Sequence, residues 1–499
     1  MKKIIFVLFL AAFTFVVFSG CEDRSDITGV DPILNGKSGS ADLTRFVVIG
    51  NSLTAGYQSG ALYETGQIYS FGSLLANQVN TKFEMPLIGE PGSGGRMEIQ
   101  GFTSAGSPIL INNSASGLPK NLSYPAPYNN LGIPGALTYD VLFATNSNNC
   151  ASALFANTPN PFFDVVLRNS SLNRGSQLQQ ALSLQPTFIT LWIGNNDVLG
   201  YATSGGVSPS APTDLTSFTQ LYGGIGQQLA ASGAQVVVAN IPAVSSIPFL
   251  TTVGPALAGN PLLVWWQISL SQTASGLPAT GLIYMSHEGG SNLGILPYKV
   301  GFADSASLRN STTLVTLRGS AYAQLLGQPT GKYYRDFNLT VPLGVDTTQL
   351  FGFHPQNPFP DIFVLDPDEI NTAQAAVTNY NNAIQSVAST FNFGLVDINT
   401  LFTNIRQADF SGGYTVDGLT FSTAYISGGL FSLDGVHPTS RGHAIITNEF
   451  IKVINAKYNA NIPKVNIATI PPSLKFTGTA GKLAGYPKVS PEAFDRLFF

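Results

Sequence analysis

The chain has 499 residues, which is enough for one large domain or two modest ones. Charged residues make up only 10% of the sequence, against about 25% in typical soluble domains. The net charge of −4 is small and there is no basic stripe, so nucleic acid is a poor candidate partner.

The first 20 residues are typical of a secretory signal peptide. Lys2 and Lys3 precede an apolar run at 4–18 that is too short to favour a spanning helix, and Ser19-Gly20-Cys21 follows. Small residues before a Cys resemble a bacterial lipobox, although Phe18 stands where that motif usually has Leu. This resemblance implies cleavage before Cys21 and its diacylation; the alternative is an ordinary cleaved signal. We therefore expect an exported lipoprotein anchored in a membrane, with the outer membrane as the expected location and the leaflet left open.

The segment after the signal is predicted to be a tether at 21–44, rich in Asp, Ser and Gly. The main domain is expected at 45–460, followed by a C-terminal tail at 461–499. If Cys21 carries lipid, no intrachain disulfide can form, because Cys150 is the only other Cys. Cys150 has no His nearby, so we predict a small buried residue rather than a catalytic thiol.

Strands are predicted to alternate with helices along the domain. Four short segments are apolar or β-branched and bounded by turn or polar residues, which predicts buried strands at 45–49, 188–193, 236–239 and 395–398. Three helices are predicted. The first spans 217–231, the second begins at the cap and acidic first turn of Asp366-Pro367-Asp368-Glu369, and the third lies around 446–454. This alternation favours a parallel sheet covered on both faces, so we predict a three-layer α/β/α sandwich with a parallel central sheet and long insertions.

Two stretches do not follow this rhythm. Residues 81–128 are rich in Gly, Pro, Ser and Asn, and residues 242–357 form a long insert. Loops of this length usually carry structure or function of their own. The apolar stretch Leu262-Leu263-Val264-Trp265-Trp266 within the insert is open to two interpretations, a lid or acyl-binding surface on one hand and core on the other.

Four short blocks contain residue types that carry chemistry, and the first two are rich in Gly. In Gly50-Asn51-Ser52, a Ser directly after a predicted strand can lie exposed at the carboxyl edge of the sheet, with its backbone N–H at a helix start that favours an anion. Asn130-Leu131-Gly132-Ile133-Pro134-Gly135 offers a backbone N–H that can approach a ligand closely. Taken alone, each block also fits a helix cap or an ordinary turn.

The other two blocks supply an amide and an acid–His pair. Gly194-Asn195-Asn196-Asp197 follows a predicted strand, and an Asn amide there is a neutral donor for an oxyanion; the alternative is a turn held by Asn and Asp. In Asp434-Gly435-Val436-His437, a carboxylate three residues before a His can orient the imidazole and stabilise its charged form; the alternative is a loop His held by Asp. None of the other His residues, His287, His354 and His443, has an acid three positions upstream.

In this order, the Ser, Gly, Asn and Asp-x-x-His blocks resemble those of the GDSL (SGNH) hydrolase family, in its bacterial lipoprotein subgroup. The resemblance covers the sheet-forming parts, about 45–240 and 360–460, and implies a flavodoxin-like fold. It implies that Ser52 is the nucleophile, that His437 is the base and that Asp434 orients His437. Asn51 replaces the Asp that gives the family its name, which leaves these roles in place but can change how Ser52 is positioned.

The same resemblance implies an oxyanion site made of the Ser52 and Gly135 backbone N–H groups and the Asn196 side chain. It implies hydrolysis of carboxylic esters through an acyl-enzyme, with an acyl lipid or an O-acylated glycan as substrate. No metal or cofactor is expected, because the sequence has no zinc-type Cys/His spacing and no GxxxxGK loop. Two alternatives stay open: an O-acetyl esterase acting on glycans, and a binding lipoprotein on the same fold without turnover.

Overall fold

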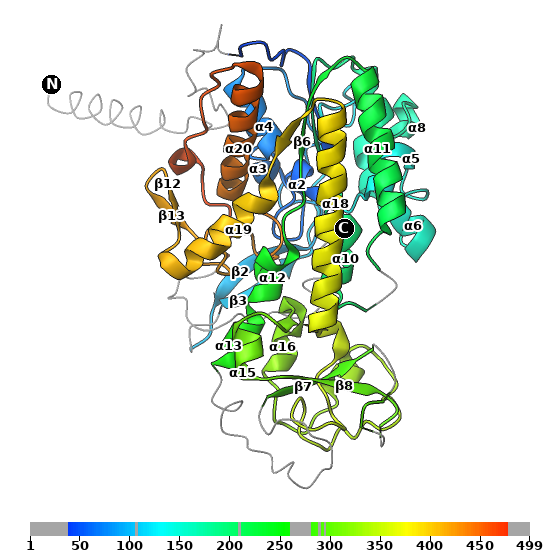
Figure 1. Ribbon diagram of the computed structural model, residues 1–499, viewed down its shortest axis with the longest axis vertical. Coiled ribbons are helices and arrows are strands. Elements are labelled where there is room, and N and C mark those ends of the chain that lie inside the picture. Colours follow the sequence, from blue (N-terminus) through cyan, green and yellow to red (C-terminus); the bar gives the residue numbers. More distant parts are fainter. Residues whose placement is uncertain are drawn as a thin grey trace, which may run out of the picture.

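The computed structural model describes residues 38–477, apart from 105–107, 208–210, 260–280, 288–290 and 294–295 (Figure 1). The predicted signal peptide, Cys21 and the stretch 262–266 lie outside the described residues. None of the helices in this part of the chain is long and apolar enough to cross a membrane.

The centre of the molecule is a sheet of five parallel strands in the order β11-β6-β5-β1-β4. The strands are β1 (Phe46–Gly50), β4 (Asn130–Gly132), β5 (Phe188–Trp192), β6 (Gln235–Ala239) and β11 (Gly394–Val396). Counted along the chain, this is the 2-1-3-4-5 order of flavodoxin-like folds. Every residue of β1 and β5 is buried, which explains why these segments are apolar apart from Thr190.

Two strand predictions differ from the structure. The expected strand at 395–398 is wrong at its end, because Asp397 accepts a hydrogen bond from Thr400 N and caps a helix, α19 (Ile398–Ala408). The sequence does not predict β4 as a strand, because its three residues, Asn-Leu-Gly, are too few and too polar to show a strand pattern. Its backbone nevertheless pairs with β1 in register Val48 to Asn130.

Helices cover both faces of the sheet (Figure 1). One face carries α4 (Phe71–Gln78) and α20 (Ser440–Tyr458), whose Phe71 and Phe450 rings stack with centroids 4.6 Å apart. The other face carries α5 (Thr138–Phe143), α9 (Gln177–Ser183), α11 (Leu215–Ala231) and α18 (Pro367–Thr390). Phe218 and Tyr380 join α11 to α18 with stacked rings 4.0 Å apart. The predicted three-layer sandwich with a parallel central sheet is thereby confirmed.

The start of α18 is built as its sequence predicts. The Asp366 side chain accepts from Asp368 N and Glu369 N, while Glu369 accepts from Asp366 N, which completes a capping box behind Pro367. A cap of this kind typically contributes about 0.5–2 kcal/mol to helix stability.

The two irregular stretches have structure of their own. Residues 81–128 contain the antiparallel hairpin of β2 (Arg96–Phe102) and β3 (Pro108–Asn113). In the insert, α13, α15, α16, β7 and β8 lie beyond the start of α18, at the bottom of Figure 1. The elements of the insert are η1 (Val244–Ser246), α12 (Pro248–Thr251), α13 (Val253–Ala258), β7 (Leu282–Ser286), β8 (Lys299–Ala303), α15 (Ser305–Arg309), β9 (Leu314–Val315), η3 (Leu317–Gly319), α16 (Ser320–Ala323) and α17 (Lys332–Asp336), followed by η4 (Asp361–Phe363) and β10 (Val364–Leu365).

Short elements complete the described chain. They are α2 (Ser52–Ala55), α3 (Glu64–Gln67), α6 (Ala151–Ala156), α7 (Phe162–Leu167), α8 (Asn169–Leu172), α10 (Asn196–Thr203), η5 (Asp409–Ser411), β12 (Tyr414–Val416), β13 (Leu419–Phe421) and η6 (Ile467–Thr469).

Both predicted ends of the domain need correction. Ala41 and Leu43 are buried in the core, so residues 38–44 pack against the domain and do not belong to a tether. Ile462 and Ile467 are buried in the same core, so the first part of the predicted tail at 461–499 is also part of the domain. The apolar residues in these two segments are too few and too irregularly spaced to predict a helix or a strand. Only their packing shows that they belong to the core.

Candidate active site

The candidate site lies where the strand order of the sheet reverses, between β1 and β5. The chain leaves β1 toward the face that carries α4 and leaves β5 toward the face that carries α11. In open parallel sheets, ligands bind at the carboxyl ends of the strands at such a reversal. Ser52 follows β1 there, and Asn196 follows β5.

Ser52 is the first residue of α2, a single helical turn directly after β1. Asn51 caps this turn, because its Oδ1 accepts from Leu53 N at 3.1 Å. The neighbouring Gly132 has to be Gly, since a Cβ there would lie 2.3 Å from Ala55 N. The close approach of β4 to α2 therefore holds Ser52 at the sheet edge.

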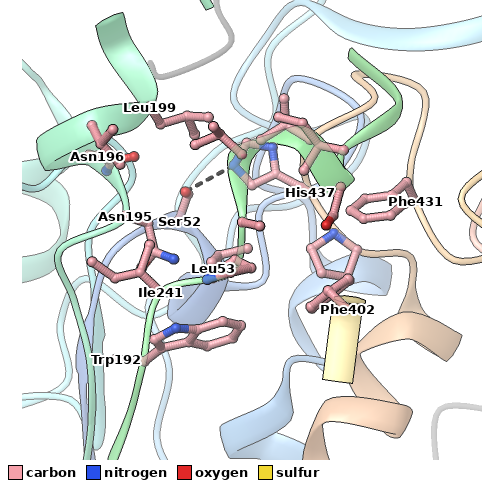
Figure 2. A pocket seen from close by; sticks show the side chains of 18 residues that line it. Ser52, Leu53, Trp192, Asn195, Asn196, Leu199, Ile241, Phe402, Phe431 and His437 are labelled. Carbon is pink, nitrogen blue, oxygen red and sulfur yellow. Dashed lines mark hydrogen bonds between the residues drawn. The ribbon is translucent and has the colours of Figure 1, made fainter. Parts of the chain in front are cut away.

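His437 reaches Ser52 from the loop before α20, although the two residues are 385 positions apart. The distance from His437 Nε2 to Ser52 Oγ is 2.9 Å, and the distance from His437 Nδ1 to Asp434 Oδ2 is 3.0 Å. Figure 2 shows the Ser52 and His437 side chains pointing toward each other. The structure thus brings together the three side chains that the sequence singled out as nucleophile, base and orienting acid.

Asp434 is fully buried and accepts four hydrogen bonds. Its Oδ1 accepts from Val436 N and His437 N, and its Oδ2 faces Gly60 N at 3.0 Å as well as His437 Nδ1. Burial alone would raise the pKa of this carboxyl, but the charge and hydrogen bond of His437, together with the backbone donors, outweigh burial and lower the pKa. Asp434 is therefore held as an anion beside the imidazole.

Two residues that support His437 and Asp434 were not foreseen. Tyr57 packs its ring against His437 with centroids 4.9 Å apart, and its hydroxyl donates to the Gly60 carbonyl. Gly60 in turn donates its N–H to Asp434, 374 positions away. No local motif marks either residue, because their role depends on a tertiary contact between distant loops.

The predicted oxyanion residues are linked through one turn. Gly135 has a φ of 78° and follows Pro134, which suits the third position of a type II turn, and the turn closes with Ala136 N donating to Ile133 O. Asn196 donates its side-chain amide to the Ala136 carbonyl at 2.9 Å. Gly135 and Asn196 are thereby held beside each other, with Asn196 lining the same cavity as Ser52.

Asn195, next to Asn196, contacts Asn51, the residue that caps α2 directly before Ser52. Asn51 Nδ2 donates to Asn195 Oδ1 at 3.2 Å, while Asn195 Nδ2 is buried without a hydrogen-bond partner among the described residues. Figure 2 shows Asn195 beside Ser52. The contact uses the side-chain amide of Asn51, the residue directly before Ser52.

A small apolar cavity of about 50 Å³ opens beside Ser52 and His437. Its wall combines the carboxyl end of β5, the loop after β6 and side chains from α19 and the loop before α20 (Figure 2). The apolar side chains that line it include Trp192, Leu199, Ile241, Phe402 and Phe431.

The remaining candidates lie elsewhere or are buried. His443, in α20, is fully buried, and neither ring nitrogen has a partner among the described residues. Burial, helped by the nearby charge of His437, lowers the pKa of His443 to about 3. Cys150 is buried as well and donates its thiol to the Ser147 carbonyl.

Comparisons with known proteins give a match to one protein-family model. Residues 46–275 match the family model described as GDSL-like Lipase/Acylhydrolase, a match that contains Ser52, Gly135 and Asn196 and supports ester hydrolysis as the general activity. Asp434 and His437 lie beyond the matched residues, and it is the fold that brings them to Ser52. The chain has no significant match among curated proteins. It is similar to a solved structure titled LAE5, an alpha/beta hydrolase enzyme from the metagenome of Lake Arreo, Spain, with 11% identity, a TM-score of 0.32 and coverage of 85% of this chain and 99% of that chain.

Proposed function

We propose that this protein is a serine hydrolase that cleaves carboxylic esters through an acyl-enzyme on Ser52. The observation that carries the proposal is the chain of contacts from Ser52 Oγ through the His437 ring to Asp434, at 2.9 and 3.0 Å. Nucleophile and base side chains in working hydrolases lie about 2.6–3.2 Å apart. The family match over 46–275 supports the same class of reaction.

Each side chain has one chemical task in this mechanism. Ser52 Oγ attacks the ester carbonyl while its proton passes to His437 Nε2. Asp434 stabilises the imidazolium that forms, and His437 then gives the proton to the departing alcohol. Water, deprotonated by His437, attacks the acyl-enzyme, and the acid product leaves as Ser52 recovers its proton.

The negative charge that develops on the carbonyl oxygen needs donors. Three are proposed: the Ser52 N–H at the start of α2, the Gly135 N–H and the Asn196 amide. The contact from Asn196 to Ala136 uses one of the two N–H bonds of that amide, which leaves the second for the oxyanion. One such donor is typically worth a few kcal/mol of transition-state stabilisation.

The cavity beside Ser52 favours a short acyl group over a long one. By the measure in which one water needs roughly 10–15 Å³, a volume of about 50 Å³ holds only a few waters, so the enclosed space suits a short acyl group. Its apolar lining suits the methyl end of such a chain. We therefore favour O-acylated substrates with short acyl groups, such as O-acetylated glycans, over long-chain lipids.

A series of chromogenic p-nitrophenyl esters tests the proposal. Acetate and butyrate should be hydrolysed with higher kcat/KM than octanoate and palmitate, and Ser52→Ala should abolish turnover. A fluorophosphonate probe should label the wild type but not Ser52→Ala. Ser183→Ala, at the end of α9, serves as the matched Ser control and should retain both activity and labelling.

Two results would contradict this function. Hydrolysis by folded Ser52→Ala at the wild-type rate would place the nucleophile elsewhere. A wild type that neither turns over any ester nor reacts with the probe would indicate a binding protein on this fold. A preference for palmitate would retain the mechanism but overturn the short-acyl assignment.

The proposal includes export and a lipid anchor at Cys21, which rest on the basic start, the apolar run and Ser19-Gly20-Cys21. Wild-type protein should fractionate with membranes and incorporate a fatty-acid probe. Cys21→Ser should lose the label and appear as soluble protein or as uncleaved precursor. Cys150→Ser is the matched control and should keep the label, because Cys150 is buried in the domain. Unlabelled wild type that still fractionates with membranes would overturn the anchor.

A further inference from the structure

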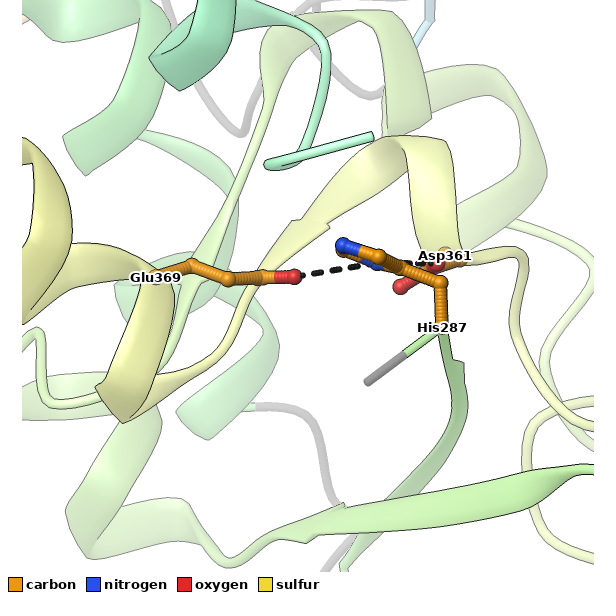
Figure 3. A group of neighbouring side chains, drawn as sticks. All are labelled: His287, Asp361 and Glu369. Carbon is orange, nitrogen blue, oxygen red and sulfur yellow. Dashed lines mark hydrogen bonds and ion pairs between the residues drawn. The ribbon is translucent and has the colours of Figure 1, made fainter. Parts of the chain in front are cut away.

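A His and two carboxylates converge at the junction between the insert and the central domain. His287 follows β7, Asp361 begins η4 and Glu369 lies in the first turn of α18. Figure 3 shows the His287 ring between the two carboxyl groups. His287 Nδ1 lies 2.8 Å from Asp361 Oδ2 and 3.3 Å from Glu369 Oε1, and all three atoms lie within 4.8 Å of one another.

These separations suit a bound divalent ion. Zn²⁺ binds imidazole nitrogen and carboxylate oxygen at about 2.0–2.2 Å, so neighbouring tetrahedral ligand atoms lie roughly 3.3–3.6 Å apart. The pair of His287 Nδ1 and Glu369 Oε1 already meets this spacing, and the shorter pair needs to open by about half an ångström. The donor set of one imidazole and two carboxylates also fits Mn²⁺.

Burial and charge favour a cation at this place. Glu369 is 1% exposed and Asp361 13%, while the side chain of His287 is 35% exposed and leaves a path from solvent. Two carboxylates with so little exposure lie side by side here, which is costly without nearby positive charge, and a bound metal ion would supply that charge.

The backbone around the group holds the carboxylates in place. Glu369 uses its other oxygen, Oε2, to accept from Asp366 N in the capping box, which leaves Oε1 directed at His287. Gly206, with a φ of 72°, packs against the same carboxyl, and a Cβ there would lie 2.6 Å from Glu369 Cδ. The loop after α10 therefore closes one side of the group and can do so only because the residue is Gly.

We propose that His287, Asp361 and Glu369 form a binding site for a divalent transition-metal ion, Zn²⁺ in the first place, with water completing the coordination. The ion would join β7 of the insert to η4 and to the start of α18, so its role would be to stabilise the junction. The sequence gives no sign of such a site, because His287 and Asp361 are 74 positions apart and no metal-binding spacing links the three. This proposal does not depend on ester hydrolysis, and Ser52→Ala should bind metal like the wild type.

The test uses the untagged full-length protein. It is stripped of metal with a chelator and then titrated with ZnCl₂ by calorimetry. The wild type should bind one equivalent of Zn²⁺. Its thermal stability should rise, because a ligand that binds only the folded state stabilises that state. His287→Ala and Glu369→Gln should weaken binding by at least the 10–100-fold that follows loss of a supporting partner. Gln at position 369 can still serve the capping box, so this variant keeps the helix start. His354→Ala is the control and should bind as the wild type does.

Each outcome of the titration either supports or overturns the proposed metal site. Stoichiometric Mn²⁺ binding that is lost in the same variants would also support the site, with the other ion as occupant. No stoichiometric binding of either ion, or binding that His287→Ala leaves unchanged, would overturn the proposed site. If the variants fail to fold, X-ray absorption of the zinc-loaded wild type decides: one imidazole in a shell of N and O ligands supports the site, and several imidazoles or sulfur overturn it.

Discussion

Asn51 donates its side-chain amide to Asn195 Oδ1 at 3.2 Å, and this bond joins the residue before Ser52 to the loop after β5. The orientation of both amides follows from Leu53, whose backbone N–H can only donate and therefore requires Asn51 Oδ1 as its acceptor. Asn51 must then offer Nδ2 to Asn195. This turns Oδ1 of Asn195 toward Asn51 and leaves Nδ2 of Asn195 without a partner in the part of the chain that the structure describes.

The Asn51–Asn195 contact predicts that Asn51→Asp, which restores the residue of the GDSL pattern, is tolerated. One carboxylate oxygen would keep the bond from Leu53 N, and a rotated Asn195 amide would give its unpartnered Nδ2 to the other. We expect kcat/KM on a soluble ester to stay within about tenfold of wild type. Asn51→Leu should be worse, because it leaves two buried polar groups unpaired at roughly 1–3 kcal/mol each.

Kinetics and urea unfolding of both variants check this prediction, and the Asn195 side-chain amide signals report the rotation by NMR. If Asn51→Asp and Asn51→Leu lower kcat/KM and stability equally, the Asn195 amide cannot rotate, and the two Asn residues are obligatory partners.

The direct contact between Ser52 and His437 predicts strongly non-additive losses. Ser52→Ala and His437→Ala should each remove nearly all turnover, and the double variant should be little worse than either, because the two act as one unit. Single-turnover rates on a chromogenic ester measure this, with folding confirmed by circular dichroism. Losses that multiply in the double variant would mean that the two residues act in separate steps.

The four hydrogen bonds to Asp434 predict that Asp434→Asn is not a mild change. Val436 N and His437 N point at one oxygen, while Gly60 N and the His437 ring share the other. An Asn amide therefore sets its NH₂ group against donors in either orientation. We expect Asn to lower both kcat and the free energy of unfolding about as much as Ala does. Steady-state kinetics and denaturant unfolding decide, and a fully stable Asn variant would contradict the hydrogen-bond scheme.

Much of this site could be predicted from local sequence. A Ser after an apolar strand, an Asn after another and Asp three residues before His each reflect a backbone arrangement that a few residues determine. The sheet was foreseen wherever the strand was apolar, as at Phe46–Gly50, and missed at Asn130–Gly132, where pairing with β1 rather than composition makes the strand.

What the sequence could not reveal depends on long-range packing. Tyr57 and Gly60 serve Asp434 and His437 across 374 positions or more, and nothing in their neighbours records that contact. The same holds for the segments at 38–44 and 461–477, whose few buried residues join the core without a helix or strand pattern in the sequence.

The amide of Asn196 predicts a loss in kcat rather than in KM. Asn196→Ala should lower kcat by about 10²–10³ with the fold intact, which is the typical effect of losing one oxyanion donor. Asn196→Asp should be at least as damaging, because a carboxylate repels both the oxyanion and the Ala136 carbonyl that Asn196 now contacts. Activity and unfolding of both variants test this. A loss confined to KM would assign Asn196 to substrate binding instead.

The last prediction concerns His443, whose burial makes the protein sensitive to acid. The pKa of His443 is about 3 in the folded state, against an ordinary value of 6.5. Between these two values the unfolded chain binds the extra proton and the folded chain does not, so stability is lost as pH falls through this window and is fully present above it. The loss amounts to at most about 1.4 kcal/mol per pH unit.

His443→Leu removes this proton, fills much of the same space and cannot leave ring nitrogens unpaired. Urea unfolding at pH 7.5, 5.5 and 4.5 should show the variant gaining on wild type as pH falls. Asp140 and Asp197, whose pKa values burial raises to about 7 and about 6, titrate in the same range, and stability falls there as they ionise with rising pH. They are present in both proteins, so their contribution cancels in the difference. Parallel stability curves for the two proteins would mean that His443 gains its proton in the folded state as readily as in the unfolded one.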